Sequence, residues 1–258
     1  MKIKPATIQQ MIIPVGALAA WELFGRLGVL PQYLSAPTWI AEGLWEFASS
    51  GELLVASAAS IFRIAVGFPI GTAAGVVAGL GAGLVPGVRQ FFDPLVSFLY
   101  PIPKIAFLPI FLLLFGLGHG SQISIIALSV FFPVFVASRH AVLSIDPILV
   151  WAAQNMGAPP RTIFFRVIIP AAGPQLFAGI RIGLAQSFVV LFAAELIGSK
   201  VGLANLTSYG EDWVRFDLMF AGIVSFAVLG FAADRALLTI RRRVLRGQLI
   251  GTEEQVTR

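Results

Sequence analysis

Long apolar runs follow one another through most of this chain and limit the folds open to it. They lie near residues 11–30, 59–85, 94–117, 121–138, 174–197 and 217–238. A helix needs about 20 mostly apolar residues to cross about 30 Å of hydrocarbon. Because backbone polar groups in lipid must bond within their own segment, each run is expected to be helical. The sequence therefore predicts an all-α integral membrane protein with about six transmembrane helices.

Composition supports the same class. Hydrophobic residues make up 57% of the chain and charged residues 12%, against about 45–50% and about 25% in ordinary soluble domains. The absence of cysteine excludes disulfides, thiolate nucleophiles and sulfur-bound metals. The net charge of +5 comes from basic residues scattered at the ends of the apolar runs. That placement fits contact with membrane lipid, and no nucleic-acid partner is expected.

The first apolar run has two interpretations. It is preceded by Lys2 and Lys4 and contains Ala17-Leu18-Ala19, which would suit cleavage of a signal peptide. The run continues through Trp21 to Leu30, however, which is longer than a usual signal core. We therefore expect a retained transmembrane anchor, with a signal peptide as the alternative.

Lysine and arginine positions predict the orientation. With the N-terminus inside, the outer loops hold only Arg26, Lys200 and Arg215. The inner loops and termini then hold Lys2, Lys4, Arg89, Arg139, Arg161, Arg166, Arg241, Arg242, Arg243, Arg246 and Arg258. We expect both termini in the cytoplasm, with the cluster from Arg241 to Arg246 at the anionic inner leaflet.

Residues 39–58 form a more polar stretch between the first two runs. Glu42, Glu46 and Glu52 lie there among Trp39, Trp45 and Phe47, so the stretch is too polar to span but amphipathic enough to lie along a surface. We interpret it as an outer interfacial helix. The expected organisation is an anchor plus this helix at 1–54, a transmembrane core at 55–245 and a cytoplasmic tail at 246–258.

Glycines recur every four residues through the second apolar run and just beyond it. They are Gly67, Gly71, Gly75, Gly79, Gly83 and Gly87. Such a series stays roughly on one helix face, where missing side chains let another backbone approach closely. Static close packing and a sliding contact within a moving bundle both fit this pattern.

Four prolines interrupt the third apolar run, at Pro94, Pro101, Pro103 and Pro109. Each removes a backbone donor and clashes with the preceding turn, so the run cannot form one straight helix. Broken backbone at membrane depth is tolerated where protein or a water-filled cavity covers it. The run either lines a pathway or forms a cytoplasmic entry loop followed by a short span.

Few ionisable residues fall within the runs. Those that need an explanation are Arg63, Lys104, Arg181 and Glu195, because a charge at mid-helix costs roughly 2.5–3.5 kcal/mol on insertion scales. One explanation is snorkelling or ion pairing between helices. The other is that some of them line the route of a solute, in which case the excess of cations would suit an anion.

The polar stretch between the fourth and fifth runs predicts two short helices on the cytoplasmic side. Asp146 and Pro147 suit a helix start, with a first helix over 148–156. Gly157 would end that helix, and Pro159-Pro160 would prevent it from continuing in the same direction. A second amphipathic segment, 161–169, precedes Pro170. Such a compact projection is suited to docking in a groove on a partner protein.

Residues 151–170 resemble the conserved cytoplasmic loop of ABC importer permeases. The family pattern is Glu-Ala-Ala, three residues, Gly, nine residues, an aliphatic, one residue, an aliphatic, Pro. The matching positions are Ala152, Ala153, Gly157, Val167, Ile169 and Pro170. Trp151 stands where the family has its acid, so an ATPase salt bridge at that position is not carried over. The expected coupling residues are Trp151, Ala152, Ala153, Gly157, Ala158, Arg161 and Pro170.

The resemblance extends over roughly residues 55–245. Within that family, the chain is similar to the nitrate, sulfonate and taurine branch. The stretches that carry it include DPLVSFLYPIPKIAFLPIFLLLFGLG, ALSVFFPVF, GIRIGLAQSF and AELIG. The resemblance implies a type I ABC importer permease in a bacterial cytoplasmic membrane, which moves a small solute by alternating access. It also implies two ATPase subunits, an external solute-binding protein and a second permease copy, which we expect to be a homodimer.

Other classes fit less well. The string Gly198-Ser199-Lys200 lacks the earlier glycine of a phosphate-binding loop, so ATP hydrolysis must come from another chain. His119 and His140 form no readable nucleophile, base or metal-ligand pattern, so we expect no enzyme activity, cofactor or metal. The alternative is a secondary transporter driven by an ion gradient, which inverted repeats and mid-membrane carboxylates would favour. The solute stays open, with a small anion such as nitrate, a sulfonate or taurine as our expectation.

Overall fold

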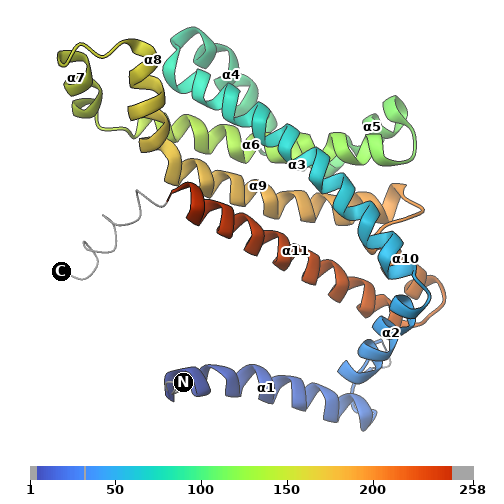
Figure 1. Ribbon diagram of the computed structural model, residues 1–258. Coiled ribbons are helices and arrows are strands. Elements are labelled where there is room, and N and C mark those ends of the chain that lie inside the picture. Colours follow the sequence, from blue (N-terminus) through green and yellow to red (C-terminus); the bar gives the residue numbers. More distant parts are fainter. Residues whose placement is uncertain (1–4, 32, 246–258) are drawn as a thin grey trace. The chain divides into compact units, whose positions relative to one another are not determined.

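All regular elements of the described chain are helices in the computed structural model, which describes residues 5–31 and 33–245. The first seven are α1 (Pro5–Arg26), α2 (Pro37–Ser49), α3 (Glu52–Leu84), α4 (Pro86–Leu99), the 3-10 helix η1 (Lys104–Phe107), α5 (Leu108–Phe115) and α6 (His119–Leu143). They are followed by α7 (Pro147–Asn155), α8 (Pro160–Ile163), the π-helix η2 (Phe164–Ile168), α9 (Ile169–Gly198), α10 (Leu203–Asp212) and α11 (Phe216–Val244). The predicted all-α fold is confirmed (Figure 1). Lys2, Lys4, Arg246, Arg258 and the expected tail at 246–258 lie outside the described residues.

Among the described residues, four helical stretches are long and apolar enough to cross a membrane, namely α3, α6, the continuous stretch Pro160–Gly198 and α11. A fifth span results if α4 is taken together with η1 and α5, which are bent by 96° to one another. The helix α1 forms where the anchor was predicted, but it carries Glu22 and Arg26 in its last two turns and is not among these spans. The expected number of about six is therefore approximate.

The helix expected between the first two apolar runs is shorter than predicted. It is α2, which ends at Ser49, whereas the sequence suggested 39–58. Gly51 follows with a φ of +81°, a left-handed conformation that glycine adopts without strain, and Glu52 then begins α3. Residues 52–58 therefore belong to a membrane-spanning helix, which amphipathic pattern alone did not indicate.

The chain divides into two compact units. One runs to Ser60 and adds Ser199–Leu229; the other comprises Ile61–Gly198 and resumes at Gly230. In the first unit, Arg215 donates to Glu46 at 2.8 Å and to Asp217 at 2.7 Å. These hydrogen bonds raise the pKa of Arg215 above its usual value, and the bond to Asp217 contributes more than the bond to Glu46. The backbone N–H of Leu203 donates to the buried Ser60 hydroxyl at 3.0 Å.

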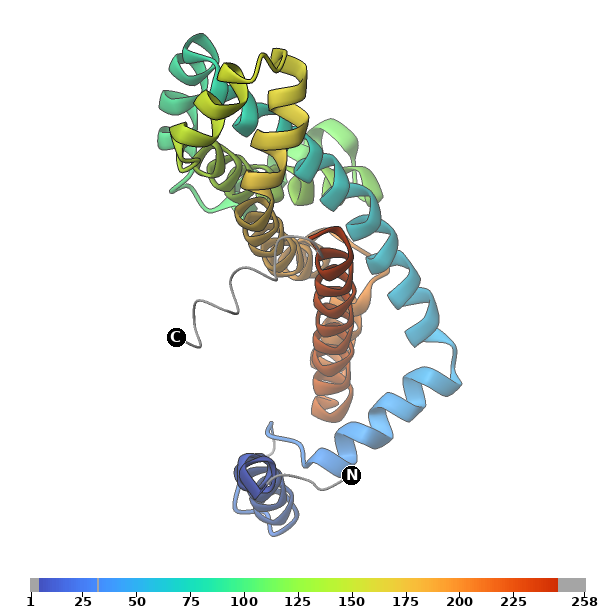
Figure 2. The same cartoon turned by 60° about the vertical axis from the view of Figure 1, so that its left-hand side comes forward.

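In the second unit, α6 packs against α3 on one face and against α9 on another (Figures 1 and 2). The glycine series of α3 faces α6: a Cβ added at Gly75 would lie 2.8 Å from the Phe131 carbonyl oxygen, and one at Gly79 2.5 Å from that of Phe135. Gly183 of α9 also faces α6, and a Cβ added there would lie 3.1 Å from the Val130 side chain. Gly87 departs from the series, because it lies in α4 and a Cβ there would meet nothing within 4 Å.

Candidate functional site

The segment from α7 to α8, Pro147–Ile163, is an α-helical hairpin whose turn is fixed by its own backbone bonds. Asp146 caps α7 by accepting from the Ile148 N–H at 2.9 Å, and Pro147 occupies the first helical position. At the other end, the Gly157 N–H donates to Gln154 at 2.9 Å and the Ala158 N–H to Ala153 at 3.0 Å. This Schellman pattern requires a left-handed residue, and Gly157 has a φ of +74°.

The α7–α8 hairpin exposes apolar side chains and buries few. Trp151 is 61% exposed and Met156 80% exposed, whereas Ala153 and Ile163 are buried. Among the other predicted coupling residues, Ala152 and Arg161 are exposed, Ala158 is half-buried and Pro170 lies in the first turn of α9. Exposed apolar side chains of this kind indicate a surface for contact with protein or with the membrane. Figure 2 shows both short arms of the hairpin and the turn between them.

The second arm of the hairpin continues directly into a membrane span. After α8, the π-helix η2 leads into α9 without a break, so Pro160–Gly198 forms one helical stretch. The sequence indicated the arm but not the π-turn, for which it carries no recognisable signal. A displacement of the hairpin would therefore pass along α9.

Arg63 and Glu195 form an ion pair in the interior of the second unit. Nη1 of Arg63 lies 2.6 Å from Oε1 of Glu195, and the two side chains are 3% and 0% exposed. Nε of Arg63 also donates to Nδ1 of His119 at 3.2 Å. Pairing removes most of the cost of placing either charge in a low-dielectric interior. Both residues, expected as possible path residues, hold α3 against α9 here.

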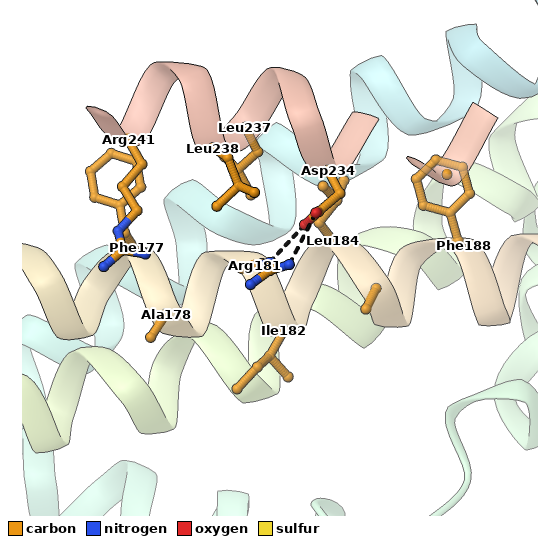
Figure 3. Close-up of a pocket in the computed structure, with 12 residues that line it drawn as sticks. Phe177, Ala178, Arg181, Ile182, Leu184, Phe188, Asp234, Leu237, Leu238 and Arg241 are labelled. Carbon is orange, nitrogen blue, oxygen red and sulfur yellow. Dashed lines mark hydrogen bonds and ion pairs between the residues drawn. The ribbon is translucent and has the colours of Figure 1, made fainter. Parts of the chain in front are cut away.

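Arg181 of α9 pairs with Asp234 of α11. Its Nε and Nη2 donate to the two carboxylate oxygens at 2.7 and 3.0 Å, while the side chains are 53% and 27% exposed (Figure 3). Asp234 was not singled out from the sequence. The available signal was an acid inside the last apolar run, opposite an arginine in the run before it.

Lys104 lies at the break between α4 and η1. Its ammonium donates to the carbonyl oxygens of Leu99, Tyr100 and Ile102 at 2.9, 2.9 and 2.7 Å, and lies 4.4 Å from the centre of the Phe132 ring. Because helix ends leave carbonyls without partners, this cation stabilises the bent backbone. The predicted kink in the proline-rich run is confirmed.

Two cavities flank α9 in the second unit. The smaller, about 240 Å³, lies at the break beside Lys104 and is also lined by Ser129 and Gln186. The larger, about 730 Å³, lies between α9 and α11 and contains Arg181, Asp234 and Arg241 among apolar side chains. Ile182 lines both. The structure thus separates the expected path residues into a buried pair, Arg63 and Glu195, and two cations beside cavities, Lys104 and Arg181.

Comparison with known protein families and sequences gives a consistent result. Residues 71–246 match the model of the family described as binding-protein-dependent transport system inner membrane component. The chain is 32% identical over 235 residues to the putative aliphatic sulfonates transport permease protein SsuC of Escherichia coli, covering 91% of this chain and 89% of that one. It is 30% identical over 254 residues to the taurine transport system permease protein TauC of the same species, covering 92% and 90%. It is also 30% identical to the riboflavin transport system permease protein RibX of Chloroflexus aurantiacus, covering 90% and 84%.

Solved structures share the fold at lower identity. An amino acid ABC transporter crystallised with histidines matches with a TM-score of 0.59 and 16% identity, covering 79% of this chain and 97% of that chain. An inward-facing form of the MetNI methionine ABC transporter matches with a TM-score of 0.56 and 20% identity, covering 71% and 94%.

Proposed function

The chain belongs to the family of binding-protein-dependent transport system inner membrane components, and from this premise we propose what it carries and how it moves it. It is a multi-pass membrane protein, the membrane-spanning permease subunit of an ATP-driven ABC importer, and a transport component rather than an enzyme. Permeases of this family work with ATPase subunits and a solute-binding protein. Nothing found here favours the secondary transporter that the sequence left as an alternative.

The proposed solute is a small organic anion of the sulfonate class. Relatives named for aliphatic sulfonates and for taurine support this class. So do the cations beside the two cavities, Lys104, Arg181 and Arg241, which exceed the one carboxylate there, Asp234. A relative named for riboflavin shows that similar permeases carry other solutes.

The proposed assembly is a homodimer of this chain with two ATPases inside and a solute-binding protein outside. In this proposal α1 crosses the membrane as a sixth span, so that both termini and the α7–α8 hairpin face the cytoplasm, and Arg241, Arg242 and Arg243 lie at the inner leaflet, in contact with lipid. This follows the distribution of lysine and arginine. Residues 1–54, 55–245 and 246–258 serve as anchor with surface helix, permease core and cytoplasmic tail.

The proposed mechanism is alternating access. ATP closes the two ATPases, which displace the hairpin docked on them, and the two permease copies rock between inward-open and outward-open forms. The observation that carries this proposal is the continuity of the hairpin with α9. That one helix connects an exposed apolar surface around Trp151 and Met156 to both cavities. The glycine contacts of α3 and α9 with α6 provide the close packing of the bundle.

Co-purification with the ATPase tests the docking surface. Tagged wild-type permease should retain its ATPase, and Gly157→Asp should lose it, because an aspartate there adds a charge to the exposed apolar surface around Trp151 and Met156. Gly51→Asp is the matched control, since Gly51 also has a positive φ, +81°, with nothing within 4 Å of a Cβ. Loss of the ATPase from both variants, or its absence from wild type, would contradict the proposal.

Uptake measurements test the anion assignment. Vesicles with Lys104→Ala or Arg181→Ala, at unchanged protein levels, should accumulate taurine or an alkanesulfonate more slowly than wild type. Uptake that is indifferent to both substitutions would show that these cations do not serve an anionic solute.

A further inference from the structure

We infer that Arg181 is the residue of this permease that binds the transported anion, and that Asp234 occupies it in the resting state and is displaced by the anionic group. The inference rests on the proposed function and names the site of that function. It concerns the groove between α9 and α11, a cavity of about 730 Å³.

The first argument is depth. Arg181 lies within α9, which runs from Ile169 to Gly198. At about 1.5 Å per residue, it is about 18 Å from the start of the helix. A hydrocarbon core about 30 Å thick surrounds such a position. The Arg181 side chain is nevertheless 53% exposed. Ionisable groups at this depth face a protein interior or a water-filled cavity rather than lipid, because lipid does not solvate them. The groove therefore faces water or a second permease copy rather than lipid, and we take it to be water-filled.

The second argument is the charge and shape of the groove. Arg181 and Arg241 outnumber Asp234, so the groove has an excess of positive charge. Within the described part of the chain, Nε of Arg241 has no hydrogen-bond partner. The remaining walls are apolar, among them Phe177, Phe188 and Leu238 (Figure 3). A cationic centre between apolar walls is complementary to an anionic group on a short carbon chain.

The third argument is the geometry of the ion pair. Asp234 accepts from Nε and Nη2 of Arg181, which leaves Nη1 outside the pair. A sulfonate oxygen can first bind at Nη1 and then replace the carboxylate oxygens on the guanidinium, whose planar fork suits oxyanions. This exchange keeps Arg181 paired throughout. The displaced Asp234 carboxylate remains in the same groove as Arg241, whose Nε can take it as a partner. Ile182, the next residue, also lines the cavity beside Lys104 and Gln186, so the two cavities adjoin the same part of α9.

The test uses the lack of cysteine in this chain. In the ATPase complex reconstituted in nanodiscs, a cysteine at Ala178, which lines the groove, is treated with thiosulfonate reagents carrying either an ethylsulfonate or a trimethylammonium group. Val77→Cys, at a position 73% exposed on α3, is the control for a lipid-facing site. Removal of one unit charge from the groove should change the rate at which a charged reagent reacts with the nearby cysteine by about tenfold.

We expect Ala178→Cys to react with the sulfonate reagent about tenfold faster than with the cationic one, and Val77→Cys to react with neither. Arg181→Gln should abolish the preference, Asp234→Asn should increase it, and ethanesulfonate should protect the cysteine unless Arg181 is removed. Three results would each overturn the inference. They are an unreactive Ala178→Cys that instead cross-links to a second permease copy, labelling without charge preference, and a preference that survives Arg181→Gln. Each can occur while the ATPase still co-purifies, so failure here is distinct from failure of the permease assignment.

Discussion

The guanidinium of Arg63 and the carboxylate of Glu195 lie 2.6 Å apart with almost no exposure, and they join α3 to α9. The pair is buried in a span-forming bundle, where each charge depends on the other for its stabilisation. Removal of one partner leaves a buried charge without this counter-ion, whereas removal of both leaves neither charge in the interior.

We therefore predict that Arg63→Met destabilises the permease by about 3–5 kcal/mol and that Arg63→Met with Glu195→Leu recovers much of the loss. The measurement is Tm in detergent, followed by tryptophan fluorescence. Arg139→Gln is the control, because the Arg139–Asp93 pair is 24% and 34% exposed and should contribute about 0–1 kcal/mol. An additive loss in the double variant would contradict the pairing.

The glycine contact of α3 with α6 predicts opposite effects for the same substitution at two positions. Gly75→Ala places a Cβ 2.8 Å from the Phe131 carbonyl oxygen and 2.9 Å from Val134, so the helices must separate, at a cost of about 1–3 kcal/mol. Gly87→Ala meets nothing within 4 Å and should be neutral or slightly stabilising, because alanine favours helix. Both are compared by Tm and by the yield of intact complex. Equal tolerance of the two would show that α3 does not pack on α6 through this face.

Lys104 should stabilise the break in the third span, since its ammonium binds three carbonyl oxygens there. Lys104→Met is predicted to lower stability by at least about 1.5–3 kcal/mol, the contribution of one hydrogen bond to a charged group. Gln186 lines the same cavity, so Gln186→Met is the control, and it should leave Tm unchanged. A Lys104→Met protein as stable as wild type would contradict this stabilising role of the ammonium.

The hairpin turn should tolerate residues according to backbone conformation rather than size. Gly157 has a φ of +74° with open space around a Cβ, so Gly157→Val is strained and Gly157→Asn is not. ATP-driven uptake should be lost or strongly reduced in the valine variant and retained in the asparagine variant. Equal uptake by both would show that the turn geometry does not contribute to coupling.

Local signals in the sequence predicted the hairpin and the bend well. The signals are Asp146-Pro147, Gly157 and Pro159-Pro160. Each determines the backbone conformation only of its immediate neighbours, so the sequence alone indicates where the two helices begin and where the turn lies. Pro101 and Pro103 predicted the bend for the same reason.

Pairings between distant residues were not predictable, because they depend on helix rotation. Glu195 as the partner of Arg63 and Asp234 as the partner of Arg181 are examples. The four-residue glycine spacing predicted one face through Gly83, but it could not show that Gly87 falls in the next helix, α4. The continuity of the hairpin with α9 through a π-turn had no sequence signal either.

The central claim is that an ATPase docks on the α7–α8 hairpin from the cytoplasm, and cross-linking from Met156 tests it most directly. A photoreactive residue at this position, 80% exposed, is compared in native membranes with one at Leu113 of α5, 88% exposed. The account predicts that Met156 forms an adduct with the ATPase subunit and that Leu113 forms none. Absence of an ATPase adduct at Met156, or reaction of this position only with reagents confined to the outside, would contradict it.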